Sequence, residues 1–424
     1  MTSLIIDNAD AQRPEVGGKI VTGPTISLLT VAVENFRMPN GFASVEDSIL
    51  ARDMQNVLKI DLGFSLFFNV VQPDSAFIAD FAKGNMNLDD WIYLGAQMLV
   101  SGRIEREADG ILFTADVTDV ARNKNVYSHD FVGEPQNYRY IMHRAASDIL
   151  YNLTGEEGSY FSKIVYSSNA SGHPEIWSCD FDGFAPTQIT RDNNIAIIPA
   201  WSNDCQKVYY TSYKNNNPDL FVYDIAQKKV ANFSARAGIN SGGLTSPDGQ
   251  YIAATLSVGG DAEIYLLDLT GRILKRLTFS KMIDTAPSWA PTSREIAFTS
   301  DRTGLPQVYI TDTEGLNTRR LTFQGDYNDQ PAWSPKGDLV AYTSRERDGF
   351  QIYTVNVVDG TTLKLTYDGS NEGASWSPDG LHLIYASSNG GDYKLMVMDY
   401  NGMNKRQYDT PGNCKTPRWS RNIK

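Results

Sequence analysis

The sequence predicts a multidomain protein of α/β plus all-β class, with an N-terminal α/β domain followed by a six-bladed β-propeller that the C-terminal strand closes. Two observations support this prediction. A Trp-Ser-Pro turn unit, as in residues 330–344, recurs at a fixed interval after residue 160. Before that point, buried-strand patterns alternate with amphipathic-helix patterns. A length of 424 residues also exceeds what one hydrophobic core usually serves, which favours two or three domains.

The charge and the cysteine content exclude several classes of function. The formal net charge is −12, which argues against a nucleic acid or an anionic membrane surface as the main partner. No segment approaches the roughly 18 consecutive apolar residues of a membrane span, so no direct membrane insertion is expected. Cys179, Cys205 and Cys414 form no CxxC pair, and they predict free thiols rather than a disulfide framework or a zinc site.

Residues 1–25 are predicted to form an extended N-terminal arm. Leu4, Ile5 and Ile6 are its clearest apolar run, and Pro14 with the glycines that follow it breaks up any longer element. The arm is either a disordered tail or a peptide that docks onto another protein as an added strand. The chain does not start with a basic region followed by an apolar stretch, so the protein is either cytosolic or has lost a signal peptide.

Residues 26–157 are predicted to form the α/β domain. Ser44 is a candidate helix N-cap and Gly155 a helix stop. In chain order, the expected elements are a strand at 27–33, a helix from 44 past 58, a strand at 64–71, a short helix at 89–94, strands at 98–104, 111–120 and 124–132, and a helix at 136–153. This part of the chain contains no glycine-rich phosphate loop, so no cofactor is expected.

Residues 158–424 are predicted to form the propeller. The turn unit, or a variant of it, is spaced by 44, 44, 44, 43 and 43 residues, at Trp201, Thr245, Trp289, Trp333, Trp376 and Trp419. A second strand accompanies it at the same interval, and six copies of this strand indicate six four-stranded blades. Pro and Gly suit the second and fourth positions of a type I turn, and the recurring Trp side chains are expected to pack between blades.

The end of the chain is expected to close the ring. In the other blades the Trp position precedes the second strand by seven residues, but blade one has Glu157 at the corresponding position. Residues 417–420 have no second strand of their own and can supply the missing innermost strand of blade one. The first and last blades then share a sheet, and the ring has no open edge.

One opening of the propeller channel is the candidate binding site. The innermost strands line the channel, and the loops that enter them converge on one opening. These loops precede each Trp position by four or five residues and carry small polar or acidic side chains, namely Asn240, Ser241, Asp284, Thr285, Asn328, Asp329, Asn371 and Glu372. This ring of side chains can hydrogen-bond a protein loop or a small ligand; alternatively, Asn and Asp merely satisfy turn backbone groups. Both interpretations can hold at the same residues.

No catalytic residue and no metal site is expected. The sequence has no Gly-x-Ser-x-Gly motif, and its four histidines are scattered without a metal-type spacing. Asp284, Asp329 and Glu372 leave a second hypothesis open, which is a propeller hydrolase or lyase that acts on a small substrate at the channel mouth. That hypothesis lacks a partnering histidine.

The order of arm, α/β domain and six blades resembles the TolB family of the Gram-negative Tol–Pal envelope system. The resemblance covers nearly the whole chain. It rests on residues of the first helix, of the segment before the central strand and of the helix before the propeller, namely Ala51, Arg52, Asp53, Phe64, Trp91, Leu94, Gly95, Arg139, His143, Ser147, Asp148 and Gly155. Thr245 in place of a Trp and residues 203–205 in place of Pro-Asp-Gly depart from the family pattern.

The resemblance implies a non-enzymatic, monomeric adaptor in the periplasm, which a removed signal peptide would explain. In the family, the propeller mouth receives Pal, the peptidoglycan-associated lipoprotein, and TolA binds the N-terminal segment. The matching arm here contains Leu4, Ile5, Ile6 and Asp7. The implied role is to support outer-membrane integrity and constriction during cell division, and in some bacteria the system is exploited for colicin import.

Overall fold

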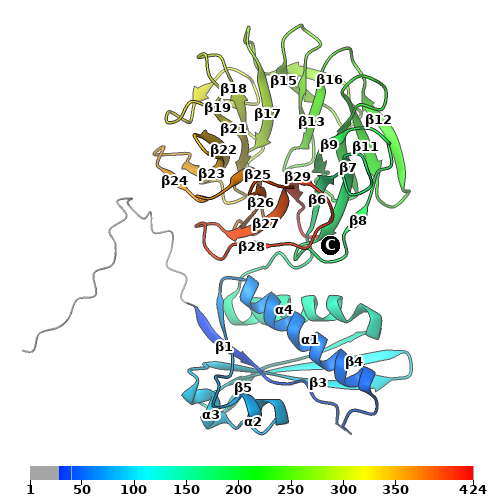
Figure 1. Ribbon diagram of the computed structural model, residues 1–424, viewed down its shortest axis with the longest axis vertical. Helices are drawn as coiled ribbons and strands as arrows, with labels where there is room; N and C mark the ends of the chain where they lie inside the picture. The colour runs from blue at the N-terminus through cyan, green and yellow to red at the C-terminus, as the bar shows by residue number, and fades with distance from the viewer. Residues whose placement is uncertain (1–27, 40, 424) are drawn as a thin grey trace, which may run out of the picture.

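The structure is a computed structural model that describes residues 28–39 and 41–423 (Figure 1). Its α/β part is built on a five-stranded sheet in the order β2-β1-β3-β4-β5. The strands are β1 (Leu29–Val33), β2 (Phe68–Val71), β3 (Met98–Glu107), β4 (Gly110–Asp119) and β5 (Lys124–Gly133). β1 pairs in parallel with β2 and β3, whereas β3, β4 and β5 form an antiparallel meander, as the sequence predicts.

Two helices cover the face of this sheet that is turned towards the propeller (Figure 1). Helix α1 (Val45–Phe64) begins at Ser44, whose side chain accepts a hydrogen bond from the backbone N–H of Asp47, so the predicted N-cap is confirmed. Helix α4 (Tyr138–Thr154) follows the short 3₁₀ helix η1 (Pro135–Asn137) and ends at Gly155 in the left-handed conformation, also as predicted.

The sequence prediction is wrong at two places in this part. The strand expected at 64–71 begins only at Phe68, because Phe64 still belongs to α1, where it is buried. A short apolar run does not distinguish a buried helix end from a strand start. The second error is α2 (Ile78–Lys83), an unpredicted helix without a side-chain N-cap, which precedes α3 (Leu88–Tyr93).

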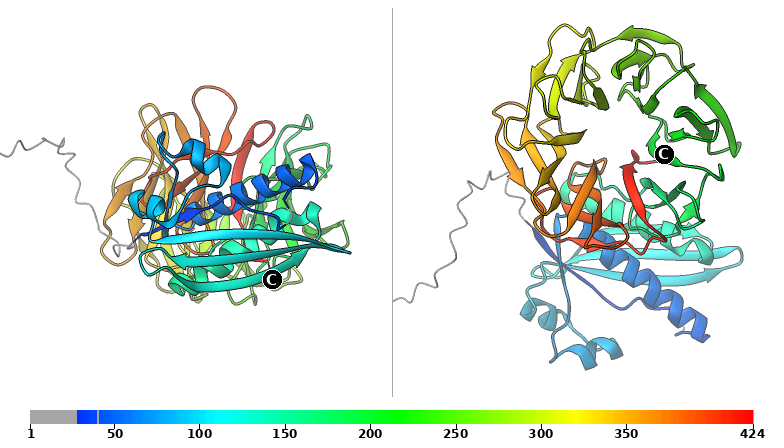
Figure 2. Two further views of the ribbon diagram at one scale, coloured as in Figure 1. Left: turned by 90° about the horizontal axis from the view of Figure 1, so that it is seen from below. Right: turned by 45° about the horizontal axis from the view of Figure 1, so that its top comes forward.

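The rest of the chain forms six four-stranded sheets around a central axis (Figure 2). In five of these blades the strands follow one another along the chain, from the axis outwards. They contain β9 (Ala196–Trp201), β10 (Lys207–Ser212), β11 (Asp219–Asp224) and β12 (Lys229–Ser234); β13 (Asn240–Thr245), β14 (Ile252–Leu256), β15 (Glu263–Leu267) and β16 (Ile273–Arg276); β17 (Asp284–Trp289), β18 (Glu295–Ser300), β19 (Gln307–Asp312) and β20 (Arg319–Arg320); β21 (Asn328–Trp333), β22 (Leu339–Glu346), β23 (Gly349–Asn356) and β24 (Thr362–Lys364); and β25 (Ser370–Trp376), β26 (His382–Ser388), β27 (Lys394–Asp399) and β28 (Arg406–Gln407).

The remaining blade joins the two ends of the propeller and confirms the predicted closure. Its order is β29-β6-β7-β8, with β29 (Cys414–Trp419), β6 (Lys163–Ser168), β7 (Glu175–Asp180) and β8 (Thr187–Gln188). Trp419 pairs with Ile164 across the antiparallel ladder. The backbone N–H of Lys163 donates to Ser420 Oγ at 2.8 Å, and the N–H of Ser420 donates to Lys163 O at 2.8 Å. The last strand thus becomes the innermost strand of the first blade and closes the ring.

The recurring Trp side chains pack between neighbouring blades, as the sequence predicts. Trp289 is buried in a cluster that contains Ala253 and Ile264 of the preceding blade. Trp333 is buried against Ala290 and Val308 of the preceding blade in the same way. These contacts bury large apolar surfaces. The recurring Trp therefore stabilises the packing of one blade on the next.

The α/β part and the propeller share one hydrophobic core. Phe64 at the end of α1 stacks on His382 of β26, with ring centroids 3.9 Å apart, and Phe181 meets the Phe64 ring edge-on. Tyr160 OH donates to the backbone oxygen of Asp61 at 3.1 Å. The two parts therefore meet through buried aromatic side chains from α1 and from the blades at the chain ends.

Candidate binding site at the propeller channel

The propeller channel has two openings, and each has its own cavity. The six innermost strands are β9, β13, β17, β21, β25 and β29. A cavity of about 190 Å³ lies nearer their first residues, and we name it the bulge opening. A cavity of about 240 Å³ lies where the strands end in Trp-Ser-Pro units, and we name it the Trp–Pro opening. Both cavities share four wall residues, which are Ala200, Leu244, Pro287 and Arg418.

A β-bulge in each innermost strand forms the ring around the bulge opening. At each bulge the register of the strand pair shifts and one residue has a positive φ. The six residues are Ile198 (54°), Gly242 (70°), Ala286 (52°), Gln330 (53°), Gly373 (69°) and Thr416 (49°). All six line the cavity. A positive φ is rare for residues other than glycine, most of all for β-branched ones, and such strain is often found at functional sites.

Three of the eight predicted site residues line the bulge opening, namely Ser241, Thr285 and Asp329. The hydroxyl of Thr299 and the backbone N–H of Gln330 donate to Asp329 Oδ1 at 2.7 and 2.6 Å. Tyr327 OH donates to Asp329 Oδ2 at 3.1 Å. The structure therefore brings together three polar side chains from three successive blades, one of them a carboxylate that three donors hold in place.

Glu372 occupies the same strand position but is not part of the cavity wall. It is partly exposed, and Lys415 Nζ lies 2.8 Å from Glu372 Oε1. Lys415 also lies over the ring of Tyr393, 3.9 Å from its centroid. This ion pair places one positive and one negative charge on neighbouring innermost strands, β25 and β29.

The other four predicted residues are not available at the opening, which corrects the sequence prediction. Asn240, Asp284 and Asn328 are fully buried, and Asn371 is 2% exposed. They lie in the first residue pairs of each innermost ladder rather than in an entry loop. Asn328 Nδ2, for example, donates to Gln307 Oε1 at 2.9 Å and to Gln324 O at 2.7 Å. These four side chains are therefore enclosed in the blades and are not exposed at the opening.

Asp284 differs from the three asparagines because its side chain can carry a charge. Arg302 Nη2 donates to Asp284 Oδ2 at 2.8 Å. Burial raises the pKa of Asp284 most, and the nearby Glu263 raises it further, while Ser300 and Arg302 act in the opposite direction. Asp284 is enclosed in the blade, so the rise in its pKa is a consequence of burial. It does not indicate an acidic group that faces the channel.

The bulge opening contains few groups that could perform acid–base chemistry. Among the described residues, Asp329 is the one carboxylate in its wall, and none of the wall residues is a His or a Cys. Within 28–39 and 41–423, no group of three or more His, Cys, Asp or Glu side chains is arranged to hold a metal ion. In the same ranges no helix is long and apolar enough to cross a membrane.

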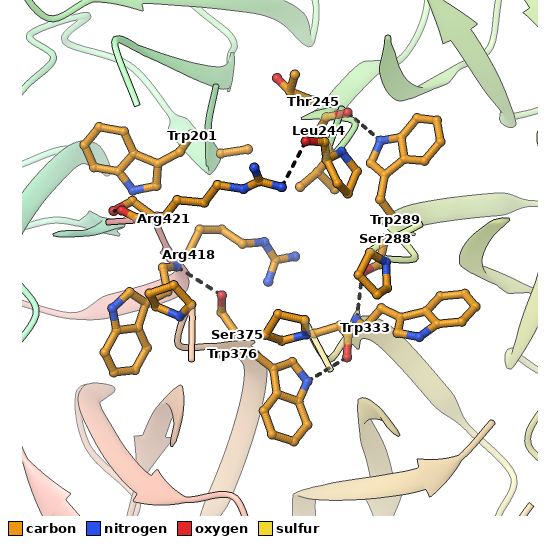
Figure 3. A pocket seen from close by; sticks show the side chains of 18 of the residues that line it. Trp201, Leu244, Thr245, Ser288, Trp289, Trp333, Ser375, Trp376, Arg418 and Arg421 are labelled. Atoms are coloured by element: carbon orange, nitrogen blue, oxygen red, sulfur yellow. Dashed lines mark hydrogen bonds between the residues drawn. The ribbon is translucent and has the colours of Figure 1, made fainter. Parts of the chain in front are cut away.

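The sequence did not predict the Trp–Pro opening as a site. Its wall contains indole and proline rings, and none of the described residues adds a carboxylate to it. Arg418 of β29 extends into it, and its guanidinium lies near the middle of the opening (Figure 3). Burial lowers the pKa of Arg418 to about 10. The signal in the sequence was the Arg itself, since it precedes Trp419 where the other repeats have Ala, Leu or Ser.

The predicted arm residues Leu4, Ile5, Ile6 and Asp7 lie outside the described residues.

The chain is similar to known TolB proteins in both of its parts. A model of the TolB amino-terminal domain matches residues 20–126, and a model of the TolB β-propeller domain matches residues 150–423. A Tol-Pal system protein TolB from Desulfosudis oleivorans is 33% identical over 246 residues, which cover 57% of this chain and 55% of the relative. One from Geobacter sulfurreducens is 36% identical over 203 residues, which cover 48% of this chain and 45% of the relative.

The curated relatives are thus matched over about half of their length. The crystal structure of TolB from Acinetobacter baumannii is matched more completely. It is 25% identical with a TM-score of 0.80, and the match covers 93% of this chain and 97% of that one. A putative TolB from Agrobacterium tumefaciens is 20% identical with a TM-score of 0.51, the match covers 61% of this chain and 92% of that one, and it supports the fold alone. Since the propeller model covers more than half of the chain and the second model covers most of the α/β part, this protein belongs to the TolB family.

Proposed function

We propose that the chain is a non-enzymatic periplasmic component of a Tol–Pal system that binds the lipoprotein Pal at the bulge opening. The main support for this proposal is the ring of Ser241, Thr285 and Asp329 around an open cavity in a TolB-family scaffold. The proposed role is to connect Pal to TolA and so to support outer-membrane integrity and constriction during cell division. The two curated relatives described above both bear the name Tol-Pal system protein TolB.

The chemistry of the bulge opening favours a protein ligand over a reacting substrate. The three polar side chains present hydroxyl and carboxylate oxygens from β13, β17 and β21, while the bulge residues add backbone and a mixture of apolar and polar side chains. Asp329 already accepts three hydrogen bonds from the protein, which occupy most of the lone-pair positions of its carboxylate. A loop with hydroxyl, amide or basic donors complements such a ring, since polar contacts at a rigid opening mainly provide specificity.

The test of Pal binding introduces a positive charge at the opening. Thr285→Lys, Asp329→Lys and Glu372→Lys are each expected to weaken Pal binding at least about tenfold, because Lys adds bulk and removes or opposes the acceptor groups. Isothermal titration calorimetry with purified Pal from the same organism measures the affinity. Asn203→Lys makes the same kind of change at the Trp–Pro opening and serves as the matched control. Unchanged affinity in Thr285→Lys, Asp329→Lys and Glu372→Lys would refute the proposal.

The proposed second contact is made by the N-terminal arm, with Leu4, Ile5, Ile6 and Asp7 adding a strand to TolA. Deletion of residues 1–12 is expected to abolish binding of TolA while Pal still binds. A pull-down with each purified partner separates the two results. Retention of TolA by the deletion variant would place its contact elsewhere on the molecule.

A further inference from the structure

We propose that the Trp–Pro opening is a second binding site, which takes a protein segment that inserts an acidic side chain and contacts Arg418. This site lies at the far end of the channel from the proposed Pal site, and its cavity of about 240 Å³ shares Ala200, Leu244, Pro287 and Arg418 with the bulge opening. The proposal does not rest on Pal binding, because the Trp rings line this cavity alone, whereas Ser241, Thr285 and Asp329 line the bulge opening alone.

The wall of the Trp–Pro opening contains many indole and proline rings, which pack well against a peptide, together with small polar side chains. The tryptophans come from five of the six innermost strands, and the prolines come from the turns and strands beside them. Trp289 Nε1 donates to Leu244 O at 2.9 Å, and Trp376 Nε1 donates to Ala332 O at 2.9 Å. Because these two indole N–H groups are already bonded within the protein, the rings of Trp289 and Trp376 offer apolar edges rather than free donors (Figure 3).

The positive charge inside the Trp–Pro opening has no negative partner among the described residues. Among the described residues, Arg418 and Arg421 are the charged side chains in the wall. Arg421 Nη2 donates to Pro247 O at 3.0 Å across the opening. Arg418 Nη1 donates to Ala374 O at 3.3 Å, and no carboxylate of the described residues forms a salt bridge with Arg418. A guanidinium has five N–H donors, so most of those on Arg418 lie in the cavity without a described protein acceptor.

A partly enclosed cation without a partner carries a free-energy cost that an anion would relieve. The planar guanidinium suits a carboxylate, which can accept two parallel N–H bonds. The protein as a whole has a net charge of −12, whereas the Trp–Pro opening is positively charged. This local positive charge favours an acidic ligand.

The other blades show that folding does not require an Arg at this position. The residues that precede the Trp position in the other five innermost strands are Ala200, Leu244, Ser288, Ala332 and Ser375. They are small or apolar and neutral, and they make the same strand and turn. Arg418→Ala therefore gives β29 the residue that β9 and β21 already have at this position. We expect this variant to fold normally, so a change in its ligand binding can be assigned to the lost guanidinium.

The size of the cavity favours a side chain over a whole small molecule. Sites that enclose a small molecule usually have about 300–1,000 Å³, and this cavity is smaller and open to solvent. A segment that places Asp or Glu beside Pro or an aromatic residue would put its carboxylate on Arg418 and its rings on the Trp–Pro wall. Proline-rich segments bind aromatic-lined surfaces in the same way.

The test compares the peptides that bind the intact chain with those that bind the Arg418→Ala variant. A phage-displayed library of random heptapeptides is selected on both proteins in parallel. The peptides recovered from the intact protein but not from the variant are expected to carry Asp or Glu next to Pro, Trp, Tyr or Phe. One such peptide is then synthesised with its Glu or Asp and with the matching Gln or Asn, and both are titrated by calorimetry.

The acidic peptide is expected to bind the intact protein at least about tenfold more tightly than its amide counterpart, and Arg418→Ala is expected to remove this difference. Recovery of the same peptides from both proteins, or Arg418-dependent peptides without a carboxylate, would overturn the proposal. Thr285→Lys is expected to leave the peptide affinity unchanged, so failure here and failure of Pal binding remain distinguishable. Equal thermal unfolding midpoints of the intact protein and Arg418→Ala confirm that the variant is folded.

Discussion

The bulge residues show how one backbone conformation shapes the channel. Each innermost strand adopts a left-handed φ three residues before its Trp position, and the residues there are chemically unlike, from Gly242 to Ile198 and Gln330. A residue with a Cβ loses roughly 1–2 kcal/mol in this conformation. The strand order and the neighbouring blades therefore impose the bulge, whatever side chain occupies it.

Two Gly→Ala substitutions are expected to have opposite effects on stability. A Cβ at Gly242 would meet only Pro287 Cδ at 3.7 Å, so Gly242→Ala has room and suffers the conformational cost alone. It is expected to lower the free energy of unfolding by about 1 kcal/mol. Gly391 lies outside the left-handed region, and a Cβ there would meet no atom within 4 Å, so Gly391→Ala is expected to raise the free energy of unfolding by about 0.5 kcal/mol.

Urea unfolding of both variants measures the two shifts. An unchanged or raised free energy of unfolding for Gly242→Ala would show that the strand relaxes at the bulge and that the left-handed conformation costs little there.

At the scale of neighbouring elements, a set of buried hydrogen bonds recurs from blade to blade and joins each blade to the next. We call this set the latch, and it includes buried asparagines such as Asn328. In four blades, the Thr of the Leu-Thr or Ile-Thr pair accepts a hydrogen bond from a backbone N–H of the third strand, 14 residues earlier. The distances are 2.8 Å for Thr190, 2.9 Å for Thr278, 2.9 Å for Thr322 and 2.8 Å for Thr366. Gln307 then connects Thr322 to Asn328 of the next innermost strand, at 2.9 Å on both sides.

Removal of one hydroxyl tests the latch. Thr322→Val is expected to destabilise the protein by about 1–3 kcal/mol, because it leaves the buried N–H of Val308 and the oxygen of Gln307 short of a partner. Thr313→Val is the matched control, since the Thr313 hydroxyl is partly exposed and forms no hydrogen bond with any described residue. Urea denaturation measures both. Equal losses in the two variants would show that the latch contributes no more than an exposed hydroxyl.

In the molecule as a whole, the last strand decides whether the ring is closed. A variant that ends at residue 413 lacks β29 and with it the buried Trp419, whose removal alone costs about 3–5 kcal/mol. This loss corresponds to a fall in the thermal midpoint of about 10 °C. A variant that ends at residue 420 keeps β29 and is expected to unfold within a few degrees of the intact chain. Calorimetry compares the two, and similar midpoints for both would contradict the closure by β29.

The free energy of unfolding is also expected to depend on acidic pH through groups at the interface between the α/β part and the propeller. His382 is fully buried, with Asp379 Oδ1 3.9 Å from Nδ1 and Asp399 Oδ1 3.8 Å from Nε2. Burial opposes the charge of Asp379, but its hydrogen bonds and the attraction of His382 outweigh burial and hold its pKa below the usual value. Burial is the largest effect on Asp399 and raises its pKa, although His382 acts in the opposite direction.

The two carboxyls therefore have opposite pH dependences. A depressed pKa gives stability above the unfolded pKa of about 4, and this is lost as the pH falls through the lower folded value. A raised pKa means that protonation on acidification stabilises the folded state. Asp379→Asn is expected to reduce the loss of stability between about pH 5 and about pH 3, whereas Asp399→Asn is expected to increase it. Unfolding free energies across this range measure both, and parallel curves would refute the assignment.

Much of this protein follows from its sequence. The Trp-Ser-Pro spacing is a strong signal because each turn requires Pro and Gly at set positions, and Gly337 N–H indeed closes its turn on Ser334 O at 2.9 Å. The six repeats and the orphan Trp419 determine the blade number and the closure. These are local patterns, and each can be read from residues that are neighbours along the chain.

Which polar side chains face the channel depends instead on the tertiary structure. Residues 328 and 329 are neighbours of similar polarity, yet Asn328 is buried in the latch and Asp329 lines the cavity, because successive side chains of a strand point to opposite sides. The phase of that alternation is set by a bulge that has no constant residue type. At the other opening, the surroundings of Arg418 come from five neighbouring blades, so the sequence around Arg418 could not show that its charge lacks a partner.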